Sequence, residues 1–261
     1  MKRVGTDYIK NRIKGYLENK TIVEKKLHIP ANYQAVAIKS KNYLQANWHQ
    51  NKITILRQVF FTSKESVLLD LGTGSGNLEF FFHNKFKKII GVDYNDEALL
   101  YLQGELLKRN ISNVELIQAD IRNLSKTKIP KVDFITMIDV IEHLKLQDVE
   151  ILVQNFTRLL EKGGKIIIVT PNYKSLWPLI EWLLERFRLV PKFTNAQHLS
   201  KMDRGVLTRV FGKNKFRLES FSTFNNISFL VPSKKISYYL CKLENFLRFP
   251  YGNLIVTVFT H

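Results

Sequence analysis

Short apolar runs alternate with amphipathic stretches between residues 66 and 170. The runs have the length of buried strands, whereas the stretches between them repeat apolar residues at the spacing of a helix. Strands are predicted at 67–70, 88–93, 114–119, 134–138 and 165–170. Strands that alternate with helices form parallel sheets with right-handed crossovers, so this part of the chain predicts an α/β fold.

The helices between these strands are predicted at 77–85, 96–109 and 148–160. The pair Gly163-Gly164 is predicted to end the last of them. The alternation stops after residue 172, and regular order returns with a helix at 200–211, a strand at 216–224, a helix at 233–247 and a strand at 253–259. The pattern therefore predicts a doubly wound sheet of seven strands.

Two segments flank or interrupt this alternation. Residues 6–61 have a helical and basic pattern with a break at 28–30, and residues 173–198 are rich in Trp, Leu and Phe. We expect a helical N-terminal extension at 1–60, one domain at 61–261, and an insertion at 173–198 within that domain.

The net charge of +17 is carried by the two ends of the chain. Residues 1–60 hold 12 Lys and Arg against 3 acids, residues 61–170 hold 14 against 15, and residues 171–261 hold 14 against 5. Basic flanks are suited to nucleic acid, an anionic membrane surface or an acidic substrate, although solvated lysine-rich faces give the same count. Cys241 is the single cysteine, and no run reaches the roughly 20 apolar residues of a spanning helix. These features predict a cytoplasmic protein.

The candidate chemistry begins at the end of the first strand, in Asp70-Leu-Gly-Thr-Gly-Ser-Gly76. Glycines at alternate positions let the backbone turn sharply and approach a ligand, and the following helix presents free N–H groups. The G-x-G-x-G spacing differs from the G-x-G-x-x-G pattern of dinucleotide-binding loops. The loop therefore predicts a cofactor site, with a nicotinamide-dependent dehydrogenase as the disfavoured alternative.

Two further strands end in an acid, at Asp93 and Asp120. A carboxylate at the tip of the second strand can accept both hydroxyls of a ribose, and one at the tip of the third can accept an adenine amino group. Either acid alone is better explained as a helix N-cap. Both acids in register with a glycine-rich loop favour a nucleoside-containing cofactor.

In these motifs the chain resembles the class I S-adenosylmethionine-dependent methyltransferases over about residues 45–225. The segments 134–144 and 159–172 match the family's fourth motif and fifth-strand segment, and they most resemble ubiquinone-type O-methyltransferases. The resemblance implies a Rossmann-like, mostly parallel seven-stranded sheet, S-adenosyl-L-methionine as cofactor, and a small-molecule, glycan or lipid-like acceptor. It also implies a set of cofactor contacts: Asp70, Gly72, Thr73, Gly74, Gly76, Asp93, Tyr94, Asp120, Ile121 and Ile138.

Methyl transfer to a hydroxyl needs positioning and a base. The candidate bases are Asp139, Glu142, His143 and His198, and we favour His143 or His198 because a neutral imidazole accepts a proton near neutral pH. His143 as a helix-end residue bonded to backbone remains an alternative. Some relatives with a Glu-x-x-Glu-His segment bind a divalent ion there, as the resemblance implies. This chain has Asp139 in the first position, so we expect no metal.

Residues 173–198 are predicted to form a lid on the acceptor side. Leu176, Leu179, Ile180, Leu183, Leu184 and Phe187 recur at helical spacing. This stripe is explained by packing against the sheet, by a dimer contact or by peripheral contact with an anionic membrane.

Two alternative functions remain for the whole protein. It could be an RNA or protein methyltransferase, or a non-catalytic cofactor-binding protein of the same fold.

Overall fold

The computed structural model describes residues 30–60, 64–187, 197–249 and 251–261. Residues 31–261 form one compact unit. The predicted helical pattern before residue 30 and residues 188–196 of the predicted lid lie outside the described residues. Within the described ranges, no helix combines the length and apolar character needed to cross a membrane.

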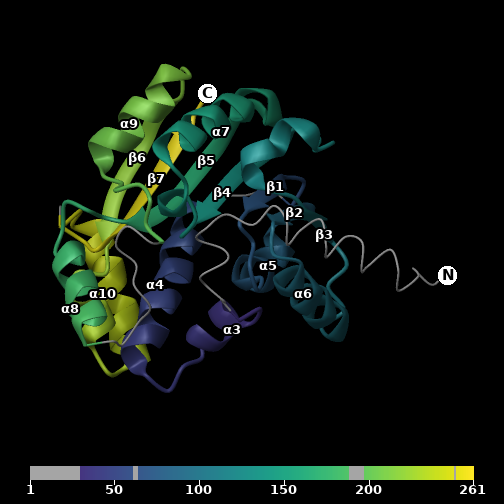
Figure 1. The fold of residues 1–261 in the computed structure, drawn as a ribbon. Helices are drawn as coiled ribbons and strands as arrows, with labels where there is room; N and C mark the ends of the chain where they lie inside the picture. The colour runs from purple at the N-terminus through teal and green to yellow at the C-terminus, as the bar shows by residue number, and fades with distance from the viewer. Residues whose placement is uncertain (1–29, 61–63, 188–196, 250) are drawn as a thin grey trace. The chain divides into compact units, whose positions relative to one another are not determined.

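In the described part of the chain the strands form one seven-stranded sheet in the order β3-β2-β1-β4-β5-β7-β6 (Figure 1). The strands are β1 (Val67–Leu71), β2 (Lys88–Asp93), β3 (Val114–Gln118), β4 (Val132–Ile138), β5 (Leu160–Pro171), β6 (Arg217–Phe224) and β7 (Leu254–Thr260). β7 is antiparallel to both β5 and β6, and the other pairs are parallel. The predicted fold class is confirmed.

Helices follow the strands in the predicted alternation. The longer helices are α4 (Tyr43–Val59), α6 (Asp96–Lys108), α7 (Leu146–Leu159), α8 (Trp177–Arg186), α9 (Arg204–Lys213) and α10 (Lys234–Phe246). The shorter ones are α3 (Tyr33–Ala37), α5 (Asn77–Phe82), η1 (His83–Lys85), η2 (Ile121–Lys126), η3 (Ile141–His143) and η4 (Ser228–Leu230).

Both faces of the sheet are buried, because successive residues of a strand point to opposite faces. Leu69 and Leu71 pack on one side with α7 and α9, whereas Leu68 packs on the other side with α4, α5 and α10. The central strands, such as β2 and β4, are therefore nearly continuous apolar runs, whereas β3 and β6 at the two edges of the sheet are more polar and more exposed.

The predicted glycine stop of α7 is wrong. The helix ends at Leu159, and β5 begins at Leu160, which pairs with Val132. Gly163, with a φ of +78°, and Gly164 fall where the register of β5 against β4 shifts. The two glycines therefore accommodate an irregularity within a strand and do not end the helix.

α8, η4 and α10 gather with α4 at one end of the sheet (Figure 1). Leu254 at the start of β7 pairs with Pro171 at the end of β5 and with Phe224 at the end of β6. The insertions after β5 and β6 consequently emerge at the same end of the strands. The parallel strands β1 and β4 also end there, so this end carries the candidate site. The boundary predicted at residue 60 stays a prediction, although Ile55 and Leu56 of α4 share a core with Leu68 of β1.

Candidate functional site

The glycine-rich loop after β1 needs glycine for conformation and for space. Gly72 and Gly76 have φ angles of +81° and +84°, a region that L side chains rarely adopt. A Cβ at Gly72 would lie 2.3 Å from Cγ2 of Val140, and one at Gly76 would lie 2.1 Å from Cδ1 of Leu102. Gly76 is also the N-cap residue of α5, so the loop delivers the start of this helix to the strand ends.

The N-terminal helix α3 holds this loop from the outside. The backbone N–H of Ala35 donates to Oγ of Ser75 at 2.9 Å, and Nδ2 of Asn77 donates to the carbonyl of Gln34 at 3.0 Å. Gln34 and Ala35 lie in the N-terminal extension predicted at 1–60, for which no site role was expected. The polar residues of a short helix carry no signal of a partner that lies 40 residues later in the chain.

A cavity of about 430 Å³, part of it open to solvent, lies between the loop and the N-terminal helices. It is lined by Gln34, His49, Lys52, Ile53, Leu56, Asp70, Gly72, Thr73, Asn77, Leu78, Ile138 and Asp139. Five of the residues predicted from the sequence are thus brought together: Asp70, Gly72, Thr73, Ile138 and Asp139.

The charged side chains around this cavity fit the amino-acid end of S-adenosylmethionine. Lys52 offers a cation to a carboxylate, and Asp70 and Asp139 offer carboxylates to an ammonium group. Apolar Leu56 and Leu78 complete the wall. A zwitterionic group flanked by apolar surface is therefore matched by the residues present.

Lys52 and Asp139 form an ion pair across the cavity. The Lys52 side chain is 4% exposed, and Asp139, just after β4, has a φ of +55°. Burial alone would raise the pKa of Asp139, but the charge of Lys52, its hydrogen bond and the nearby histidines together outweigh burial and lower it. Burial, reinforced by the charge of Lys52, lowers the pKa of neighbouring His49 to about 3, so this imidazole is neutral. Lys52 and His49 were missed, and their shared helix face was the only sequence signal.

Asp70 and Glu79 form a buried acid pair behind the loop. Asp70 accepts a hydrogen bond from Oγ1 of Thr136 at 2.6 Å, and Glu79 accepts one from the hydroxyl of Thr73. Burial raises the pKa of Asp70 to about 6. Burial and the adjacent Asp70 raise the pKa of Glu79 well above its ordinary value. The pair therefore holds protons at a pH where exposed carboxyls have lost them.

Asp93 ends β2 and is tied to the glycine loop. Its Oδ2 accepts from the N–H of Gly74 at 2.8 Å, and its Oδ1 accepts from the N–H of Asn95 at 2.9 Å. Burial raises the pKa of Asp93, and hydrogen bonds from these amides counteract the shift. Tyr94, the next residue, is exposed. Asp93 thus couples the tip of β2 to the conformation of the loop.

Asp120 lies close by in the sheet, because Asp93 pairs with Gln118 at the end of β3. Its carboxylate caps η2 by accepting from the N–H of Arg122 at 2.9 Å, and it forms an ion pair with the Arg122 side chain. Ile121 is buried in the core. The capping alternative is therefore realised, and the cofactor contacts of Asp120 and Ile121 stay predictions.

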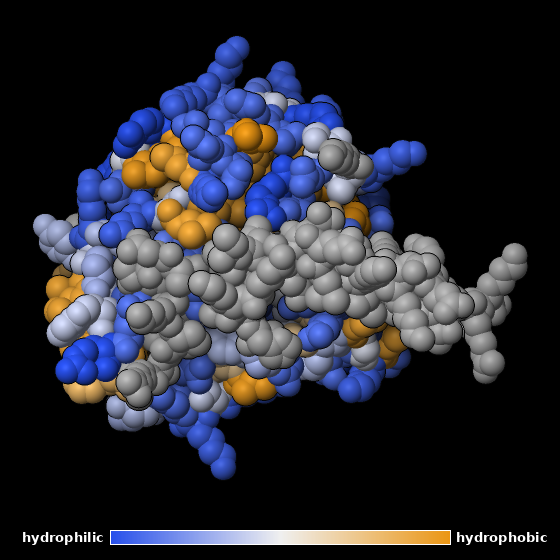
Figure 2. Space-filling model, in the orientation of Figure 1, coloured by the Kyte–Doolittle hydropathy of each residue, from blue (hydrophilic) through white to orange (hydrophobic). Residues whose placement is uncertain are grey.

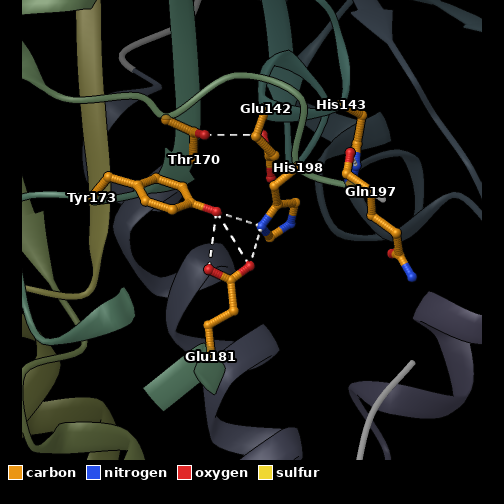
Figure 3. A network of polar contacts seen from close by, with 7 residues as sticks. All are labelled: Glu142, His143, Thr170, Tyr173, Glu181, Gln197 and His198. Atoms are coloured by element: carbon orange, nitrogen blue, oxygen red, sulfur yellow. Dashed lines mark hydrogen bonds and ion pairs between the residues drawn. The ribbon is translucent and has the colours of Figure 1, made fainter. Parts of the chain in front are cut away.

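Beyond Asp139, the short helix η3 and the insertion bring a second polar cluster together (Figure 3). Nδ1 of His198 lies 2.7 Å from Oε1 of Glu181 and 2.7 Å from the hydroxyl of Tyr173. Glu181 is 2% exposed and His198 is 8% exposed. Burial alone would lower the pKa of His198, but the hydrogen bond to Glu181 and the charge of Glu142 outweigh burial and raise it.

Glu142 and His143 face this network from the end of β4. Oε2 of Glu142 accepts from the hydroxyl of Thr170 at 2.9 Å, and Nδ1 of His143 lies 3.0 Å from the carbonyl of Gln197. The centroids of the His143 and His198 rings are 5.2 Å apart. Donor atoms of Glu142, His143 and His198 lie within 4.8 Å of one another. The predicted grouping is realised for these three residues, whereas Asp139 is engaged by Lys52.

Tyr173 and Glu181 were not predicted as site residues. Glu181 sits among the apolar residues of α8, and an acid within an apolar helical stripe was the available signal in the sequence. The structure turns it inward to a histidine 17 residues later.

Comparison with known proteins places this site in a family. Residues 44–220 match the model of the methyltransferase domain family. The chain is 29% identical over 111 residues to (S)-coclaurine N-methyltransferase of Papaver somniferum. The aligned residues cover 42% of this chain and 30% of that protein. It is 27% identical over 156 residues to ribosomal RNA small subunit methyltransferase G of Thermotoga petrophila, which covers 58% of this chain and 62% of that protein. The chain thus matches less than two thirds of the length of either relative.

The fold agrees with this assignment. A SAM-dependent methyltransferase from Archaeoglobus fulgidus superposes with a TM-score of 0.57 at 18% identity, covering 81% of this chain and 94% of that one. The family match spans the glycine loop, Asp93, Asp139 and β5. The chain therefore belongs to the methyltransferase domain family, among the class I methyltransferases, and S-adenosylmethionine is its cofactor.

Proposed function

We propose that this protein transfers the methyl group of S-adenosylmethionine to a hydroxyl or amine of a small-molecule, glycan or lipid-like acceptor. The observation that carries this proposal is the buried Tyr173–His198–Glu181 network. The network lies next to Asp139, and Asp139 lines the cavity at the glycine loop. Asp139 contributes to the raised pKa of His198, so cavity and network belong to one electrostatic environment.

The residues divide between holding the cofactor and activating the acceptor. The bound cofactor supplies an electrophilic methyl group. Lys52 would hold the cofactor carboxylate, Asp70 and Asp139 would face its ammonium group, and Asp93 would contact the ribose. His198 takes the proton of the acceptor as general base, while Glu181 fixes the orientation of the imidazole and stabilises its charged form. Positioning supplies much of the rate, on the order of 7–11 kcal/mol of barrier lowering.

An RNA acceptor is the second candidate. The ribosomal RNA relative and the net charge of +17 favour it. The two candidates are separated by measuring the transfer of a labelled methyl group. One set of reactions contains small-molecule hydroxyl and amine acceptors, and the other contains total RNA. Cofactor binding without transfer to either panel would favour the non-catalytic alternative.

Replacing Asp93 by alanine is expected to weaken binding of S-adenosylhomocysteine by about 10- to 150-fold, since charge-assisted hydrogen bonds contribute roughly 1.5–3 kcal/mol. The substitution removes the proposed ribose contact and also the acceptor of the Gly74 and Asn95 amides. Isothermal titration calorimetry measures the change. Asp96→Ala, in the first turn of α6, is the matched control and should bind as the wild type does. Wild-type affinity in the Asp93 variant would contradict the ribose assignment.

Exhaustive chelation is expected to leave methyl transfer unchanged. Glu142, His143 and His198 could approach one ion, but each already has a protein partner in Thr170, Gln197 or Glu181. Activity after dialysis against a strong chelator tests this expectation. A loss that added Mg²⁺ or Zn²⁺ restores would establish a metal requirement.

A further inference from the structure

Helix α10 exposes its apolar side chains. Ile236, Tyr239, Leu243 and Phe246 recur every three or four residues, and all are exposed, Phe246 at 80%. The buried positions of the same helix are Ser237, Cys241 and Glu244. A surface helix ordinarily buries its apolar stripe and exposes its polar side. α10 has the opposite orientation.

Hydrogen bonds fix α10 in this orientation. The Glu244 carboxylate accepts from the backbone N–H groups of Ile227 and Ser228, each at 2.8 Å, and of Asn226 at 3.1 Å. Rotating the helix to bury Phe246 would leave these amides without their acceptor, and a buried amide that loses its acceptor destabilises the fold. The apolar stripe is therefore held outward.

Helix α8 is oriented in the same way. Glu181 points inward to His198, whereas Leu179, Trp182 and Phe187 are exposed, Trp182 at 56% and Phe187 at 67%. Packing against the sheet, one of the explanations for this stripe, therefore does not account for these three side chains. Trp177, on the opposite side of the helix, is the buried aromatic residue.

The two stripes lie at one end of the molecule. Trp177 of α8 packs on Trp48 with ring centroids 5.1 Å apart, and Trp48 packs on Phe229 of η4 at 5.1 Å. η4 in turn packs on α10. Figure 2 shows hydrophobic residues at the lower left, where α8 and α10 lie in Figure 1.

Cations accompany these apolar side chains. Arg186 ends α8, Lys234, Lys235 and Lys242 lie on α10, and Arg248 follows it, all exposed. Two of the three acids in these helices, Glu181 and Glu244, are buried. Exposed aromatic and aliphatic side chains with adjacent Lys and Arg are the composition of helices that lie in the interface of anionic bilayers.

We propose that the exposed faces of α8 and α10 form a surface that docks on an anionic lipid bilayer. Trp182, Phe187 and Phe246 enter the interfacial region, and the lysines contact lipid phosphates and carboxylates. Docking goes beyond the proposed methyl transfer and does not depend on it.

The test is flotation of the full chain with vesicles of phosphatidylcholine, with and without phosphatidylserine. We expect partitioning onto phosphatidylserine vesicles that weakens as salt is added, because screening reduces the attraction. Trp182→Ser and Phe246→Ser should each weaken partitioning by about 10- to 150-fold if the side chain inserts fully. Lys234→Gln and Lys235→Gln should each weaken it by about fivefold.

Leu107→Ser is the matched control. Leu107 is 72% exposed on α6, which packs on β2 and β3 at the opposite edge of the sheet. This variant should partition as the wild type does, and S-adenosylhomocysteine affinity in every variant reports an intact fold. Absence of partitioning at low salt, or equal partitioning of Phe246→Ser and the wild type, would overturn the proposal. A wild-type dimer that Phe246→Ser dissociates, without vesicle binding, would instead identify the surface as a homodimer interface.

Discussion

Replacing His198 by asparagine is expected to lower kcat by about 10²- to 10⁴-fold, the usual contribution of a general base. The affinity for S-adenosylhomocysteine should stay within a few-fold, because His198 does not line the cavity at the glycine loop. Asparagine retains a side chain of similar size that can still hydrogen-bond to Glu181 and Tyr173, so the change isolates the loss of the base. The measurement is steady-state transfer to the acceptor that the panel identifies.

His143→Asn is the matched comparison, because both histidines were candidate bases. Nδ1 of His143 lies against the Gln197 carbonyl, which corresponds to the backbone-bonded alternative, whereas Nδ1 of His198 is held by a buried carboxylate. A smaller loss is therefore expected for His143→Asn. The reverse order of the two losses would assign the base to His143.

The pH profile tests the role of Glu181. A base must be neutral to act, so activity should rise with pH through the raised pKa of His198. Glu181→Gln removes the first of the interactions that raise this pKa, and the acidic limb should move to lower pH. The charges that still face the imidazole are Glu142 and Asp139, with Tyr173 and His143 beside it. An unchanged profile would show that Glu181 acts only in packing.

The central sheet could be predicted from sequence because burial on both faces leaves a local record. Each strand from β1 to β4 is a short apolar run followed by a polar residue at the strand end, so β2 and the acid Asp93 were located together. The start of β5 was missed because Leu160 pairs with Val132, 28 residues earlier, and the local pattern contains only the pair Gly163-Gly164.

The site was predictable where its residues follow strands and unpredictable where they come from other elements. Asp70, Gly72 and Asp139 carry such a signal. Lys52 meets Asp139 across 87 residues, and nothing in α4 specifies that partner. The stripes of α8 and α10 show the same limit, because periodicity defines the apolar face of a helix but not the direction in which tertiary contacts turn it.

The acid pair behind the glycine loop leads to an expected dependence of stability on pH. Burial raises the pKa of Asp70 from 3.8 to about 6, so the folded state binds a proton more tightly than the unfolded state does. A carboxyl with a raised pKa destabilises the fold as pH rises through this window. For one such group, the free energy of unfolding falls by roughly 3 kcal/mol between a pH of about 4 and a pH of about 7.

Glu79→Gln is therefore expected to flatten this decline. The substitution removes the negative charge that Glu79 would acquire, and its amide can donate a hydrogen bond to ionised Asp70, which lowers the pKa of Asp70. The variant should gain unfolding free energy relative to the wild type at pH of about 7–8 and little or none at about 4, as measured by chemical denaturation. Glu105→Gln, on the surface of α6, is the control, because Lys108 and Arg109 lower the pKa of Glu105 and that substitution should not reproduce the gain at neutral pH. If the free energy of unfolding of Glu79→Gln and of the wild type depended on pH in the same way, other contacts of the loop would already stabilise the ionised acid pair.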